Sequence, residues 1–153
     1  MHLWDEKKNY FIPSVGSEIY VQTDIGSRSF DNGVFPSVNL LFDHSLPGRI
    51  EFEYNIGATR KRNLSGHSYE LSFPWSFTRE IVHDLNLFVE GFYGSTTIPR
   101  SPGVRGFRRA SNHAVGAGAL WTVNSRIAVW SSYAFGTKQQ TPDMISVGFA
   151  VAF

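Results

Sequence analysis

Hydrophobic and polar residues alternate along most of this chain. The pattern is clearest at residues 144–153, where every odd-numbered residue is large and apolar and the even-numbered residues after Met144 are Ser, Gly or Ala. A period of two is typical of a β-strand with one apolar face. Turn residues separate similar segments elsewhere, so the sequence predicts about eight antiparallel strands joined by hairpins. These segments lie near residues 18–25, 38–43, 50–57, 69–77, 85–93, 115–121, 127–135 and 145–153.

Alternation alone fits either of two all-β folds. In a soluble sandwich or barrel the apolar face is the core, whereas in a membrane barrel it faces lipid and the polar face lines the lumen. The polar face here carries Glu51, Glu53, Glu70 and Glu90. We therefore expect a closed, up-and-down transmembrane β-barrel, and we keep the soluble fold as the alternative.

Three further features favour the membrane barrel. Connections of alternating length are expected, with short turns near residues 43–49, 78–84 and 123–126 and longer loops near 60–68, 95–112 and 136–143. The connection at residues 31–33 is a short exception. Each predicted strand has about the 9–11 residues that a tilted spanning strand needs. Aromatic residues also gather near the predicted strand ends, where interfacial girdles lie: Trp75, Phe77, Tyr93, Trp121, Tyr133, Phe135 and Phe153.

The end of the chain resembles the C-terminal signal of bacterial outer-membrane proteins. The resemblance lies in Phe149, Val151 and the terminal Phe153, which are alternate residues on the apolar face of the last predicted strand. It implies recognition by the barrel-assembly machinery and a location in the bacterial outer membrane.

The second half of the chain resembles the outer-membrane channel family named for the meta-pathway of phenol degradation. The resemblance lies in Leu-Ser-Phe-Pro-Trp at residues 71–75, Leu-Phe-Val-Glu at 87–90, His-Ala-Val-Gly-Ala-Gly at 113–118 and Val-Gly-Phe at 147–149. It implies passive transport of small, hydrophobic molecules and carries over no catalytic residue. Family members are usually longer, with more strands, so this chain would be a short relative or a truncated barrel.

Composition narrows the remaining choices. A length of 153 residues suggests one domain over 1–153, with residues 1–14 as a periplasmic N-terminal segment. The absence of cysteine excludes disulfides and thiolate metal sites. Residues 1–8 are polar and do not look like a secretory leader, which a barrel of this kind requires. We therefore expect the leader to be missing from this sequence, and whether upstream strands are missing too stays open.

Acidic residues on the polar parity are the predicted lumen residues. Inside a barrel of about eight strands such charges need partners or water, because side chains nearly fill the interior. Lys61 and Arg126 are candidate partners. Two interpretations stay open, a packed polar plug and a wet, cation-favouring lumen. The predicted lumen acids are Glu18, Asp24, Glu51, Glu53, Glu70 and Glu90.

Basic residues gather in two connections that we expect on the outer side. Arginine pairs with phosphate in a bidentate manner, so these connections are candidates for contact with lipopolysaccharide phosphates. A solvated loop without a ligand is the alternative. Nucleic-acid binding is not expected, because the net charge is only +1. The basic residues are Arg60, Lys61, Arg62, Arg100, Arg105, Arg108 and Arg109.

Other chemistry is weakly indicated. Histidines lack metal-ligand spacing, and neither a metal nor a cofactor is expected. The Gly-Ala-Gly at residues 116–118 is not followed by a third glycine, and we expect it to let neighbouring strands approach closely. Pro74 should interrupt strand pairing. A lipid-modifying rim esterase would need a triad, and the candidates are His67 and Ser68 beside Glu70, or Ser111 and His113 near Glu90. The sequence thus leaves three hypotheses of function. The first is a passive channel, the second is a non-conducting barrel with a structural or surface-interaction role, and the third is a lipid-modifying enzyme at the rim.

Overall fold

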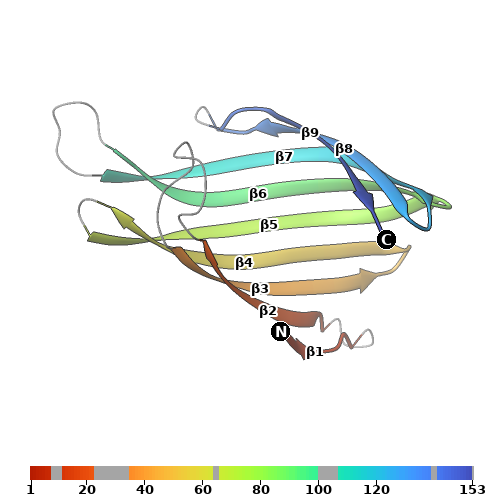
Figure 1. Cartoon of the computed structure of the whole chain (residues 1–153), viewed down its shortest axis with the longest axis horizontal. Helices are drawn as coiled ribbons and strands as arrows, with labels where there is room; N and C mark the ends of the chain where they lie inside the picture. Colours follow the sequence, from red (N-terminus) through yellow and green to blue (C-terminus); the bar gives the residue numbers. More distant parts are fainter. Residues whose placement is uncertain (8–11, 23–34, 64–65, 100–106, 139–140, 153) are drawn as a thin grey trace.

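One antiparallel β-sheet makes up the computed structural model of this chain. The structure describes residues 1–7, 12–22, 35–63, 66–99, 107–138 and 141–152. Each strand pairs with the next along the chain, in the order β1 to β9, and the sheet is strongly curved (Figure 1). The strands are β1 (His2–Trp4), β2 (Ser14–Gln22), β3 (Phe35–Leu46), β4 (Ile50–Asn63), β5 (Gly66–Val82), β6 (Leu85–Pro99), β7 (Phe107–Asn124), β8 (Ile127–Gly136) and β9 (Met144–Val151).

The predicted all-β, up-and-down antiparallel fold is confirmed, but the strand count and the closure differ from expectation. The sheet has nine strands in the described part of the chain. There β9 pairs with neither β1 nor β2, so the sheet is not closed. The additional strand is β1, which lies within the segment expected to be an N-terminal extension. It pairs with Val15 and Gly16 of β2 and so occupies part of the edge at which a barrel would close.

Strands β3 to β7 are longer than the sequence suggested, and several connections are shorter. β5 has 17 residues and β7 has 18, instead of 9–11. The expected loop at 60–68 is mostly strand, since Arg62 pairs with His67 and Asn63 with Gly66. Likewise β6 and β7 pair as far as Pro99 and Phe107, so only residues 100–106 connect them. Polar residues continue these hairpins, because backbone pairing does not require an apolar side chain. The short connection at 31–33 lies outside the described residues.

Cross-strand register joins the predicted strands into two consistent faces. Leu40 pairs with Ile56, and Phe77 pairs with Val89. Val89 in turn pairs with Ala117, so the apolar positions of neighbouring strands lie side by side. Aromatic rings stack across this face, with centroid distances of 4.6 Å for Phe42 and Tyr54 and 4.2 Å for Phe52 and Phe77. Cross-strand aromatic pairs of this kind favour one register over its alternatives.

The apolar face is exposed rather than packed into a core. Val147 is 80% exposed and Leu87 is 46% exposed. Among the described residues, the buried apolar side chains are only Val15, Ala114 and Ala134. A soluble sandwich would bury its apolar face against a second layer, and no second sheet occurs in the described part of the chain. No helix there is long and apolar enough to cross a membrane.

The pairing supports one local prediction in part and a second one fully. The β4–β5 ladder omits the position of Pro74 and resumes at Gly57 and Ser72 in the same register, whereas the β5–β6 ladder continues through the pair of Pro74 and Phe92. A Cβ atom on Gly116 would lie 2.5 Å from the carbonyl oxygen of Tyr133, so only glycine allows β7 and β8 to approach this closely. Trp75, which we expected near a strand end, instead lies within β5 and packs over Gly91.

Candidate functional site

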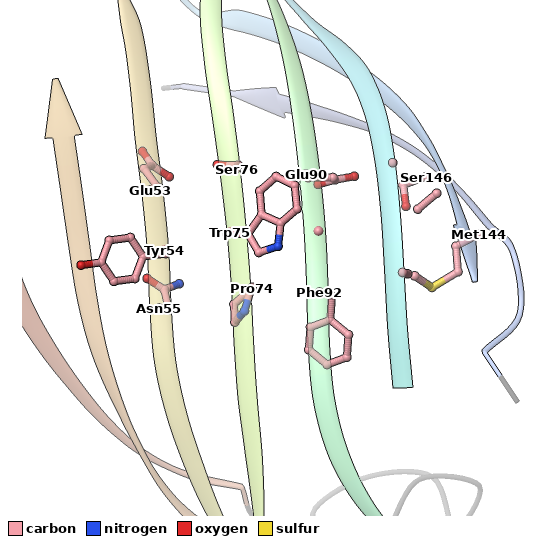
Figure 2. A pocket seen from close by; sticks show the side chains of 14 residues that line it. Glu53, Tyr54, Asn55, Pro74, Trp75, Ser76, Glu90, Phe92, Met144 and Ser146 are labelled. Atoms are coloured by element: carbon pink, nitrogen blue, oxygen red, sulfur yellow. The ribbon is translucent and has the colours of Figure 1, made fainter. Parts of the chain in front are cut away.

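A cavity of about 380 Å³ lies against the polar face of the sheet. Its lining comes from strands β4 to β9, and a single curved sheet can bring such distant strands to one cavity only on its concave side. Glu53, Ser76 and Glu90 lie at the same level on β4, β5 and β6 (Figure 2). Met144 and Ser146 of β9 contribute the opposite side. The polar face is therefore the concave face, and the apolar face is convex.

Strand register explains why the two glutamates meet at this cavity. Asp43 pairs with Glu53, Glu53 with Ser76, and Ser76 with Glu90. Residues paired in this way project from the same side of a sheet. Asp43 and Glu53 are exposed and Glu90 is half-buried, so water can solvate this row of carboxylates. We refer to Asp43, Glu53, Ser76 and Glu90 as the acidic row.

The other predicted lumen acids share the concave face where they are described. Glu51 pairs with Thr78, and Glu70 pairs with Thr59. Glu18 pairs with Asn39 and accepts a hydrogen bond from its side-chain amide at 3.3 Å. Asp24 lies outside the described residues. The sequence parity thus placed these acids on one face, whereas their grouping into rows depends on register.

Beyond the acidic row the cavity is lined mainly by small residues, which the sequence alone did not place there. Ala114 and Ala134 contribute from β7 and β8, and Phe92 lies on β6 two residues from Glu90. The small residues of β7 to β9 were a visible signal of close packing. Their position across the cavity from Glu53 and Glu90 follows only from the curvature of the sheet.

Several predicted loop arginines belong to strands instead. Arg60, Lys61 and Arg62 are in β4, and Arg108 and Arg109 are in β7. This corrects their assignment to loops, and the reason is the extended pairing of the β4–β5 and β6–β7 hairpins. Both groups nevertheless reach the same end of the sheet, where the 64–65, 100–106 and 137–143 connections lie. We call this end the long-connection rim. Arg100 and Arg105 lie outside the described residues.

The β8–β9 connection folds back onto this rim. The backbone N–H of Thr137 donates to the carbonyl oxygen of His113 at 2.9 Å, and the ring Nδ1 of His113 lies within hydrogen-bond distance of the Thr137 hydroxyl. The Lys138 ammonium donates to the Ser111 hydroxyl. Asp143 accepts from the Tyr133 hydroxyl at 2.8 Å and from the Gly136 N–H at 3.0 Å. These two hydrogen bonds stabilise the charged carboxylate and lower the pKa of Asp143.

The suggested rim triad does not assemble. Ser111 and His113 are alternate residues of β7 and lie on the same convex face as Val115. Glu90 pairs with Gly116, which lies on the concave face. The carboxylate is therefore on the opposite side of the sheet from the serine and the histidine. The other candidates, His67 and Ser68, lie on β5 and pair with Arg62 and Lys61 of β4. Within the described residues no group of His, Asp and Glu is arranged to hold a metal ion.

The C-terminal segment presents its apolar residues outward. Phe149 is 73% exposed and Val151 is 45% exposed, both on the convex face of β9. Phe153 lies outside the described residues.

This fold defines a class of antiparallel sheet proteins with an exposed apolar convex face and a polar concave face that holds a cavity. The family model described as "Putative MetA-pathway of phenol degradation" matches residues 1–153, and the chain belongs to that family. The match extends over the first half as well, where the sequence analysis had found no resemblance. No curated protein and no solved structure matches the chain.

Proposed function

We propose that this protein is an outer-membrane channel through which small molecules pass along the concave face. The observation that carries the proposal is the division of the sheet into an exposed apolar convex face and a polar concave face with a cavity. Lipid stabilises the first face, and water stabilises the second. Membership of the phenol-degradation family supports small, hydrophobic compounds as the transported class.

A channel of this kind requires a closed sheet. In lipid, unpaired backbone groups at a sheet edge cost several kcal/mol each. Because neighbouring strands alternate in direction, β9 runs antiparallel to β2. We infer that β9 pairs with the part of β2 that β1 leaves free, which gives a barrel of about eight strands.

The lining of the cavity favours amphipathic passage. Glu53 and Glu90 offer charge and hydrogen-bond acceptors from β4 and β6, and Ala134 and Met144 offer apolar surface from β8 and β9 on the other side. A small molecule with a polar group and an apolar body can contact both sides without losing either kind of interaction. The carboxylates also favour cations over anions.

One observation favours a second candidate, a non-conducting barrel with a structural or surface-interaction role. The Trp130 ring lies over Gly148 on the concave face, so a large side chain occupies space between β8 and β9. Barrels of about eight strands are often filled by such side chains. The rim enzyme has no comparable support, since Glu90 lies across the sheet from Ser111.

Single-channel conductance of the refolded protein in a planar bilayer tests the proposal. A shift in gel migration between unheated and boiled samples must first demonstrate a folded barrel. Steady openings are expected from the channel, whereas a folded but silent protein would favour the non-conducting barrel. Detergent-free solubility together with identical migration of both samples would contradict the membrane proposal itself.

A further inference from the structure

Charge is unequally distributed between the two ends of the sheet. The long-connection rim carries Arg60, Arg62, Arg109 and Lys138 together with other basic residues. Of its described acids, Asp143 is engaged by Tyr133 and Gly136, and Glu70 has interactions of its own. At the opposite end, which we call the short-turn rim, Glu51, Glu80 and Asp84 stand beside Arg49, Arg79 and Arg126, so neither sign of charge predominates.

The basic positions continue the apolar convex face. Along β4, residues of one parity run from Ile50 through Ile56 and then reach Arg60 and Arg62. Along β7 the same parity runs from Trp121 through Val115 to Arg109. The change from apolar to basic residues therefore occurs at a similar place on two strands that are not adjacent.

Exposed tyrosines mark this transition. Tyr69 pairs with Arg60 and is 56% exposed, and Tyr93 pairs with His113 and is 42% exposed. Tyrosine and tryptophan favour the boundary between the hydrocarbon and the headgroups of a bilayer. Trp121, which is 52% exposed, occupies the corresponding place toward the short-turn rim. The basic residues then lie just beyond the hydrocarbon, at the depth of the lipid headgroups.

Lys138 adds a positioned cation to this belt. The β8–β9 connection is attached to β7 through the Thr137–His113 hydrogen bonds, and Ser111 accepts a hydrogen bond from the Lys138 ammonium. An ammonium held in this way is a compact cation that can contact a phosphate as a point charge.

We propose that the convex face of the long-connection rim binds the phosphate groups of anionic lipid headgroups, with Arg60 and Lys138 as contacts at two separate places along it. This inference rests on the proposed membrane function, because only insertion brings the rim to headgroup depth. The short-turn rim cannot serve the same ligand equally well, since its arginines stand among several carboxylates. The lipid therefore also distinguishes the two ends of the protein.

The test compares two double variants that each remove two positive charges. Arg60→Gln with Lys138→Gln alters the long-connection rim, and Arg79→Gln with Arg126→Gln is the matched control at the short-turn rim. Binding of bisphosphorylated lipid A to detergent-solubilised, folded protein is measured by native mass spectrometry. Lipid A without phosphates and inorganic phosphate alone are the comparison ligands.

Wild type and the control variant should bind bisphosphorylated lipid A with similar affinity, and the rim variant should bind about tenfold more weakly. Phosphate-free lipid should bind weakly to all three proteins. Equal binding by the rim variant and wild type would overturn the proposal, as would equal affinity for lipid with and without phosphates. Tight binding of inorganic phosphate alone would show an anion site that is not specific to lipid, and would overturn the lipid assignment.

Failure of this proposal can be distinguished from failure of the proposed function. Conductance is measured on the same preparations, so a silent barrel that binds lipid A leaves the rim proposal intact and contradicts the channel. A conducting barrel whose lipid A binding is unchanged by the substitutions at Arg60 and Lys138 would support the channel and contradict the rim proposal. If wild type does not fold into detergent or vesicles at all, the membrane placement and the rim proposal both fail.

Discussion

Glu53 on β4 and Glu90 on β6 face the same cavity from either side of Ser76, because all three residues belong to one cross-strand row. Two carboxylates so placed should attract cations into the concave side of the sheet. The combined substitution Glu53→Gln and Glu90→Gln should reduce the cation-to-anion permeability ratio about two- to tenfold. Reversal potentials in a salt gradient measure this ratio.

Asp84→Asn is the control for that experiment. Asp84 lies in the turn between β5 and β6 with a positive φ of 69°, a conformation that asparagine also tolerates. The substitution removes one carboxylate at the short-turn rim, away from the acidic row, and should change the cation-to-anion permeability ratio less. An unchanged ratio in the double glutamine variant would mean that ions do not pass the acidic row.

Closure of the sheet can be tested by disulfide formation, because the chain has no cysteine of its own. Tyr20 of β2 and the even-numbered residues of β9 have the concave parity. Tyr20→Cys combined with Met144→Cys, Ser146→Cys or Gly148→Cys, tried separately, should give an intramolecular disulfide for at least one pair. Non-reducing gels of the folded protein report the product.

The control for closure is a cysteine pair on opposite faces of the sheet. Tyr20→Cys combined with Ile145→Cys gives such a pair and should not form a disulfide. A product of twice the monomer mass would indicate closure through a second copy instead of within one chain. Absence of every cross-link would contradict the pairing of β2 with β9.

Val89 tests which face contacts lipid. Its side chain is 47% exposed on the convex face of β6, midway between Tyr93 and the partner of Trp121. Val89→Arg should lower the unfolding free energy by about 2–4 kcal/mol, because this site lies near the middle of the apolar face. Denaturant titration in vesicles measures the change. Ser76→Arg, which adds the same charge to the acidic row on the concave face, should cost less, and equal costs would contradict the assignment of the two faces.

Asp143 should make the β8–β9 connection sensitive to acid. Its pKa is lower in the folded protein than its ordinary value of 3.8, because the Tyr133 hydroxyl and the Gly136 N–H donate hydrogen bonds to the carboxylate. The stabilisation is therefore fully present above that ordinary value and is lost as the pH falls through the folded-state pKa. Unfolding of wild type and Asp143→Asn, followed between pH 7 and about pH 2, should converge at the acidic end. Parallel profiles would exclude a role for this carboxylate.

The C-terminal residue is expected to matter for assembly more than for folding. Deletion of Phe153 should reduce the amount of heat-modifiable protein in bacterial outer membranes, while refolding in detergent stays close to that of wild type. Quantitative immunoblotting of unheated and boiled samples compares the two. Equal assembly in cells would remove the support for recognition of this segment by the barrel-assembly machinery.

The period of two in the sequence was sufficient to determine most strands of this protein and the two faces of its sheet. It predicted the strands, assigned Leu87 and Val147 to one face, and assigned Glu53 and Glu90 to the other, because successive side chains of a strand point to opposite sides. Alternation is a property of neighbouring residues, so a single strand is sufficient to reveal it.

Tertiary structure decided what depends on pairing between strands. Register brought Glu53 and Glu90 into one row, extended the hairpins through Arg60 and Arg109, and placed Lys138 against Ser111. It also separated Glu90 from Ser111 and added β1 at the sheet edge. Alternation does not encode these relationships, because a shift of two residues in register preserves both faces while it changes every cross-strand neighbour.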